Sequence, residues 1–74
     1  MTHGERASFA AQLPRLMDAR GVSQSELARR SGVTRQTVSR IVQGHTTPGA
    51  ATVRVLAAAL GVDPGAVSLG LEGE

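Results

Sequence analysis

The chain has 74 residues, contains no cysteine and carries a formal net charge of +2 at pH 7. This length makes one domain at most, and the lack of cysteine excludes a disulfide framework and a cysteine-rich zinc site. The longest strictly apolar runs are far shorter than the roughly 20 residues of a membrane span, and the N-terminus lacks the charged-then-apolar order of a signal peptide. We therefore expect a cytoplasmic protein without a membrane segment.

The basic residues are unevenly distributed, and every one of them is arginine. Residues 23–47 contain Arg29, Arg30, Arg35 and Arg40 against one acid, Glu26, so the positive excess lies in the middle of the chain. Guanidinium groups suit forked hydrogen bonding to phosphate or guanine. A GC-rich coding sequence explains the lack of lysine equally well, so this feature alone decides nothing.

No alternating strand pattern occurs, which predicts an all-α fold. The first helix is indicated by apolar residues at helical spacing, Phe9, Leu13, Leu16 and Met17. Gly21 is its expected end, and residues 1–8 are expected to form an N-terminal arm ahead of a domain at 9–69. Pro14 falls inside the pattern, so the helix either kinks there or starts late with Pro14 in its first turn. The pattern does not choose between these.

Two short helices follow, separated by one glycine. Ser23 stands three residues before Glu26, the spacing of a reciprocal capping box, and predicts a helix from about Gln24 to Ser31. Gly32 can supply the positive φ that ends this helix. After Val33, which is expected to pack into the core, Thr34 is a suitable N-cap for a third helix over about Arg35 to Gln43.

The C-terminal third predicts two further helices. Thr47-Pro48 is the expected cap and first-turn pair of a fourth helix that ends at Gly61. Its expected buried face consists of Val53, Leu56, Ala57 and Leu60. Asp63-Pro64 is the expected start of a short fifth helix that runs to about Leu69. Residues 70–74 are expected to form a flexible tail. The sequence therefore predicts a compact bundle of five short helices.

The third helix has two contrasting faces. Val38, Ile41 and Val42 form one apolar stripe at 100° per residue. The opposite face carries Gln36, Ser39, Arg40 and Gln43, with Arg35 beside them at the helix start. A solvated face ordinarily mixes acids and bases, yet this one has no carboxylate. Arg and Gln can pair with guanine and adenine edges in the major groove of B-DNA, so the face favours base recognition.

These residues also carry a family resemblance. SQSELARRSGVTRQTVSRIVQG (23–44), with Leu13, Leu16, Pro48 and LAAALGV (56–62), resembles the lambda-repressor-like, Xre-type helix-turn-helix regulators of phages and bacteria. The resemblance covers about residues 9–69. It places Leu27 and the small Ala28 where the two motif helices cross and Gly32 at the turn.

The resemblance implies a sequence-specific transcriptional regulator that binds double-stranded DNA. We expect a repressor, although the sequence does not separate a repressor from an activator. The resemblance implies a DNA-binding set of Gln24, Thr34, Arg35, Gln36, Thr37, Ser39, Arg40, His45, Thr46 and Thr47. Within this set we assign Arg35 and Gln36 to base edges and Gln24 to a backbone phosphate. Ser39 and Arg40 would reach further bases or phosphate, and residues 45–47 would contact the backbone. Helix capping is an equally good account of Thr34 and Gln24, and a solvated surface is the lesser alternative for Arg35, Gln36 and Arg40.

One departure from the family predicts a core contact. Many members have an arginine at the position of Met17 paired with a glutamate at that of Val42. Both positions are apolar here, and exchanging a whole buried ion pair for packed apolar groups can be neutral or stabilising. We therefore expect Met17 to touch Val42.

Other functions have weaker support. His3 and His45 lack neighbouring ligands for a metal, and no nucleophile turn or phosphate loop is present, so we expect no enzyme and no cofactor. Ala66 to Leu71 is expected to close the core or to form a dimer contact. Three alternatives stay open: a homodimeric repressor, an antitoxin with a partner protein, and a protein-interaction module that uses the same fold without DNA.

Overall fold

A computed structural model describes residues 1–68. These residues form five helices, α1 (His3–Arg20), α2 (Gln24–Ser31), α3 (Arg35–Val42), α4 (Ala50–Leu60) and α5 (Pro64–Ser68). No strand occurs within this part of the chain. The predicted all-α bundle of five helices is confirmed.

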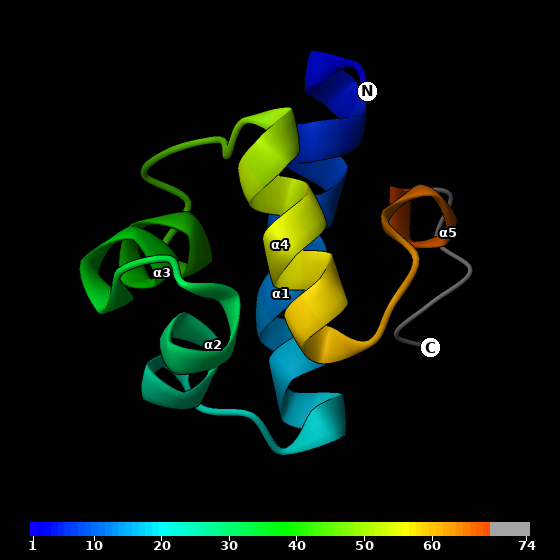
Figure 1. Ribbon diagram of the computed structural model, residues 1–74. Helices are drawn as coiled ribbons and strands as arrows, with labels where there is room; N and C mark the ends of the chain where they lie inside the picture. The colour runs from blue at the N-terminus through cyan, green and yellow to red at the C-terminus, as the bar shows by residue number, and fades with distance from the viewer. Residues whose placement is uncertain (69–74) are drawn as a thin grey trace.

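The helices are arranged around the pair formed by α1 and α4 (Figure 1). α2 and α3 lie together on one side of this pair, and α5 lies on the other. The shared core consists of Phe9, Leu13, Leu16, Met17, Val22, Leu27, Val38, Ile41, Val53, Leu56, Ala57, Leu60, Val62 and Val67. Among the described residues no polar or charged side chain is buried to this degree. Apolar burial therefore holds the helices together.

The start of α1 corrects the sequence prediction. The helix begins at His3, so most of the expected arm at residues 1–8 is helical. Thr2 and Glu5 form a complete capping box, in which the Glu5 N–H donates to Thr2 Oγ1 (3.1 Å) and the Thr2 N–H donates to Glu5 Oε1 (2.8 Å). This box satisfies two of the otherwise unpaired N–H groups at the helix start, which is why the helix extends so far toward the N-terminus.

Pro14 lies inside α1 rather than in its first turn, so the late start is wrong. Its ring is exposed to solvent, away from the core. Proline has no N–H for the carbonyl four residues earlier, which weakens the helix locally. Phe9 and Leu13, both fully buried on the same helix, offset this cost by holding α1 against the other helices.

The helix-turn-helix boundaries agree with the sequence. α2 spans the predicted residues, and α3 ends one position early, with Gln43 as its C-cap. The predicted capping box of α2 forms only in part. The Glu26 N–H donates to Ser23 Oγ (3.1 Å), whereas the Glu26 carboxylate accepts hydrogen bonds from Arg29 and Arg30. Two nearby guanidinium groups compete more strongly for this carboxylate than one backbone N–H does.

The start of α4 was also predicted wrongly. Its N-cap is Gly49, without a side-chain hydrogen bond, and the helix begins at Ala50 rather than at Thr47-Pro48. Pro48 is buried outside the helix, and its carbonyl accepts a hydrogen bond from Arg6. Because Arg6 and Pro48 are 42 positions apart, their bond leaves no signal in the sequence near Pro48.

The four buried residues predicted for α4 are confirmed.

α5 begins where the sequence predicted. Asp63 Oδ1 accepts a hydrogen bond from the Gly65 N–H (2.8 Å), and Val67 is fully buried. Gln12 on α1 donates to the Val67 carbonyl (2.6 Å), so this short helix is attached to α1. Leu69 and the tail at 70–74 lie outside the described residues, as does part of the expected dimer contact at 66–71.

The expected contact between Met17 and Val42 has partial support. Met17 belongs to the buried core, and Val42 is half-buried and packs against that core. α1 and α3 touch each other. The direct contact between the two side chains stays a prediction, which a charge substitution can test.

Met17→Arg should lower the free energy of unfolding by about 3–5 kcal/mol, because it places an unpaired charge in the core. Adding Val42→Glu should restore at least about 1 kcal/mol if the two side chains face each other. Urea denaturation measures both changes. Val55→Arg, at a position 40% exposed on α4, is the matched control and should change stability by less than about 0.5 kcal/mol. A double variant no more stable than Met17→Arg would disprove the contact.

Candidate nucleic-acid interface

The turn between α2 and α3 fixes how α3 is presented. Gly32 has a φ of 78°, a left-handed conformation that glycine adopts without steric cost. Its N–H donates to the Ala28 carbonyl (3.0 Å), and the next N–H, that of Val33, donates to Ser31 Oγ (3.2 Å). Val33 packs against the core as predicted. The chain therefore reverses within a few residues and starts α3 at a defined angle to α2.

The inner face of α3 is held firmly. Val38 and Ile41 are almost completely buried, and Thr34 caps the helix by accepting from the Thr37 N–H (3.2 Å). Thr34 Oγ1 also donates to Thr37 Oγ1 (2.9 Å). Both threonines are thus engaged in the first turn of the helix, and the capping alternative for Thr34 is supported.

The outer face of α3 forms an open groove with the start of α2, with a volume of about 480 Å³. Its lining residues are Gln24, Arg35, Gln36, Ser39, Arg40 and Gln43. The structure therefore brings together residues that the sequence assigned to base edges and to phosphate. Their roles in binding stay predictions.

Gln43 was not in the predicted set, although the sequence places it on the same face of the helix. Its Nε2 donates to Ser39 Oγ (3.1 Å), so the two side chains form one polar unit at the end of α3. The helical spacing was sufficient to find it.

The groove is positive and lacks carboxylates. Arg35 and Arg40 contribute its charge, and none of its lining residues is acidic. α3 likewise has no acidic residue in its first turn. Such a surface attracts phosphate and offers many donors and acceptors to base edges.

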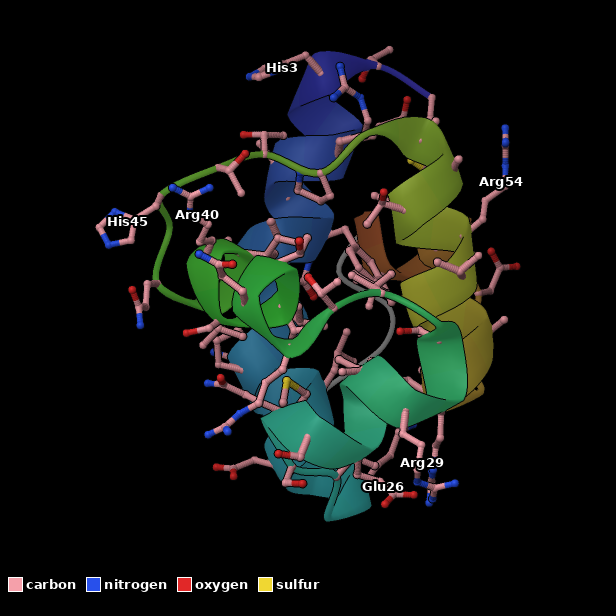
Figure 2. The ribbon with its side chains drawn as sticks, turned by 60° about the vertical axis from the view of Figure 1, so that its left-hand side comes forward. His3, Glu26, Arg29, Arg40, His45 and Arg54 are labelled. Atoms are coloured by element: carbon pink, nitrogen blue, oxygen red, sulfur yellow. The ribbon has the colours of Figure 1, made fainter. Side chains whose placement is uncertain are left out.

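Two other arginines of the motif are paired. Arg29 and Arg30 both contact the carboxylate of Glu26, with a distance of 2.7 Å from Arg30 Nε. Figure 2 shows Glu26 and Arg29 at the opposite end of the motif from Arg40 and His45. The hydrogen bond from Arg30, then the charge and hydrogen bond of Arg29, lower the pKa of Glu26 below its ordinary value of 4.5. The positive charge of Arg29 and Arg30 is therefore partly balanced within α2.

The loop between α3 and α4 holds the remaining predicted residues. His45 and Thr46 are exposed and Thr47 is half-buried. His45 points to the same side as Arg40 (Figure 2). Thr46 and Thr47 line a smaller recess of about 200 Å³ against α1, together with Ala7, Ala10, Ala11, Ile41, Val42 and Gly44. The loop residues thus lie beside the groove rather than in it.

Two further candidate features are absent from the described residues. No group of three or more His, Cys, Asp or Glu side chains is close enough to hold a metal ion within residues 1–68. No helix in this range is long and apolar enough to cross a membrane.

A short helix, a tight glycine turn and a second helix with a positive outer groove define a helix-turn-helix protein. A family model described as helix-turn-helix matches residues 15–67. The chain therefore belongs to the lambda-repressor-like, Xre-type helix-turn-helix family, as its sequence predicted. This membership supports a DNA-binding regulator. No curated protein matches the chain.

The lowered pKa of Glu26 predicts a pH-dependent contribution to stability. Because the folded-state pKa lies below the unfolded value of 4.5, the pair with Arg29 and Arg30 stabilises the fold above that pH and loses its effect as the pH falls through the folded pKa. The Glu26→Gln protein should therefore be less stable than the parent near pH 7 and equal to it near about pH 2. Thermal unfolding across this range measures the difference. A difference that does not change with pH would contradict the ion pair.

Proposed function

We propose that this protein is a sequence-specific transcriptional regulator that represses by placing α3 in the major groove of an operator. The observation that carries the proposal is the carboxylate-free groove over α2 and α3, with Arg35, Gln36 and Arg40 on its walls. The major groove of B-DNA admits an α-helix, and its base edges offer the partners that Arg and Gln prefer. Occupying the operator requires no catalysis, and we propose no enzymatic activity.

The roles of the residues follow from their places in the groove. Arg35 at the start of α3 suits a guanine edge, and the neighbouring Gln36 suits an adenine edge. Gln24 is the first residue of α2, where the side-chain amide and the helix N–H groups can bind the same phosphate. Ser39, Arg40 and the loop at 45–47 extend these contacts to further bases and phosphates.

A repressor of this size is proposed to act as a homodimer in the cytoplasm. One domain buries modest area on DNA and binds weakly alone. Two copies related by a two-fold axis would place their α3 helices in major grooves about 34 Å apart, so the operator would be an approximate palindrome. An antitoxin that also binds a toxin would use the same DNA surface and is the closest alternative.

Arg35→Ala should remove the preference at one base position of each half-site and weaken operator binding by about 1–3 kcal/mol per monomer. Selection from a random DNA pool with both proteins, followed by affinity measurements, tests this. Arg54→Ala is the matched control, since it removes the same charge from α4 on a side away from Arg40 (Figure 2). Loss of the same base preference in both variants would contradict the assignment of Arg35.

Gln24→Ala should weaken binding to all sequences alike, since a phosphate contact carries no base information. The dependence of log affinity on log salt should stay close to that of the parent, because Gln24 is neutral. Titration of an operator and of a scrambled duplex over a range of salt concentrations measures both effects. A change in the selected motif would place Gln24 on a base instead.

A protein-interaction module is the rival from another class, and the low net charge of +2 is the feature in its favour. The same selection experiment separates the two. A folded parent protein that enriches no sequence and shows no steep salt dependence would support the rival.

A further inference from the structure

Arg6 connects two parts of the chain that are distant in sequence. Its Nη1 donates to the Pro48 carbonyl at 3.0 Å, across 42 positions. Arg6 is half-buried on the first turns of α1, and Pro48 is buried just before the N-cap of α4. The loop from α3 rises toward the N-terminal end of α1 before it enters α4 (Figure 1). The bond therefore joins α1 to the end of this loop.

The two ends of the loop are held in different ways. At the α3 end, the His45 N–H donates to the Arg40 carbonyl (2.9 Å) and the Gly44 N–H donates to the Ile41 carbonyl (3.0 Å). At the α4 end, the N-cap Gly49 provides no side-chain hydrogen bond. There Pro48 is buried and its carbonyl accepts the bond from Arg6, and the Gly49 carbonyl accepts a hydrogen bond from the Val53 N–H (2.9 Å).

Between these ends the loop has little packing support from α1. The α1 side chains that line the recess of about 200 Å³ beside Thr46 and Thr47 are alanines, Ala7, Ala10 and Ala11. Alanine side chains beside an open recess make few van der Waals contacts with the loop. A hydrogen bond from a charged guanidinium to a carbonyl, as from Arg6 to Pro48, is stronger and more directional than such contacts.

We propose that Arg6 is a positioning residue for DNA binding, which holds the loop so that His45, Thr46 and Thr47 meet the phosphate backbone while α3 lies in the groove. The inference rests on the proposed function for its DNA readout. It assigns no DNA contact to Arg6 itself, whose Nη1 is directed at Pro48. The expected effect is on affinity and not on base preference, because the lining of the α3 groove does not include Arg6.

The test compares Arg6→Met with the parent in DNA titrations at several salt concentrations. Methionine keeps an unbranched apolar stem while removing the donors, so the packing of α1 is disturbed least. Arg6→Met should weaken operator and scrambled duplex alike by about five- to tenfold, the loss of one or two neutral hydrogen bonds to phosphate. Arg6→Lys, which keeps a donor and the charge, should stay within about twofold of the parent.

A double-mutant cycle distinguishes positioning from direct contact. If Arg6 acts through the loop, Arg6→Met should have no further effect on affinity in a His45→Ala/Thr46→Ala/Thr47→Ala protein, and the salt slope should stay unchanged. If Arg6 binds phosphate itself, its substitution should cost the same in both backgrounds and reduce the salt slope by about 0.9. The second result overturns the proposal, as does an unchanged affinity in Arg6→Met.

A measurement without DNA separates this inference from the proposed function. NMR relaxation of the free protein should show lower backbone order parameters at His45–Thr47 in Arg6→Met than in the parent, with those of α3 unchanged. Unchanged order in the loop overturns the positioning role whatever the protein binds. If the loop is more mobile in Arg6→Met but the parent selects no DNA sequence, Arg6 does hold the loop through Pro48. Its role in DNA binding and the proposed function would then both be overturned.

Discussion

The groove over α2 and α3 exists because these two helices pack against each other across the turn at Gly32 and against α1 and α4. Each helix has only eight residues, too few to be stable alone in water. Their stability comes from Leu27, Val38 and Ile41, which are buried against α1 and α4. Because its inner face holds α3 in place, the outer face needs no stabilising pairs of acids and bases. The absence of carboxylates around Arg35 and Arg40 is therefore compatible with a stable helix.

α2 and α3 differ in how the charge of their arginines is balanced. On α2, Glu26 binds Arg29 and Arg30, so charge is balanced locally and the helix gains pairs at i,i+3 and i,i+4. On α3, the arginines at 35 and 40 have no acidic neighbour in the groove. Of the motif's arginines, those on α3 are thus the ones whose charge is available to a phosphate or a guanine. The uneven charge seen in the sequence becomes a difference between the two helices in the structure.

Sequence was sufficient wherever the deciding interaction is local. Ser23, Gly32 and Thr34 act on groups within a few residues of themselves, and the boundaries they predict for α2 and α3 agree with the structure to within one position. The polar face of α3 follows from helical spacing, which places Gln43 there. The Thr2–Glu5 box is equally local, and the three-residue spacing of Thr2 and Glu5 is the sequence signal for it. The start of α4 could not be found in this way, because Pro48 is fixed by Arg6 from the other end of the chain.

A net charge of only +2 bears on how such a protein would select a site. Nonspecific affinity for DNA grows with the number of phosphates that cations neutralise, so a domain with few cations gains less from this term than a strongly basic one. Discrimination then depends on base contacts that α3 can make only when its angle and depth in the groove are fixed. The proposed phosphate contacts on both sides of the helix, from Gln24 at the start of α2 and from the loop next to Arg6, would provide that alignment. Neutral groups such as amide and hydroxyl serve this purpose without raising nonspecific binding, which fits a surface that carries few unpaired charges but many hydrogen-bonding side chains.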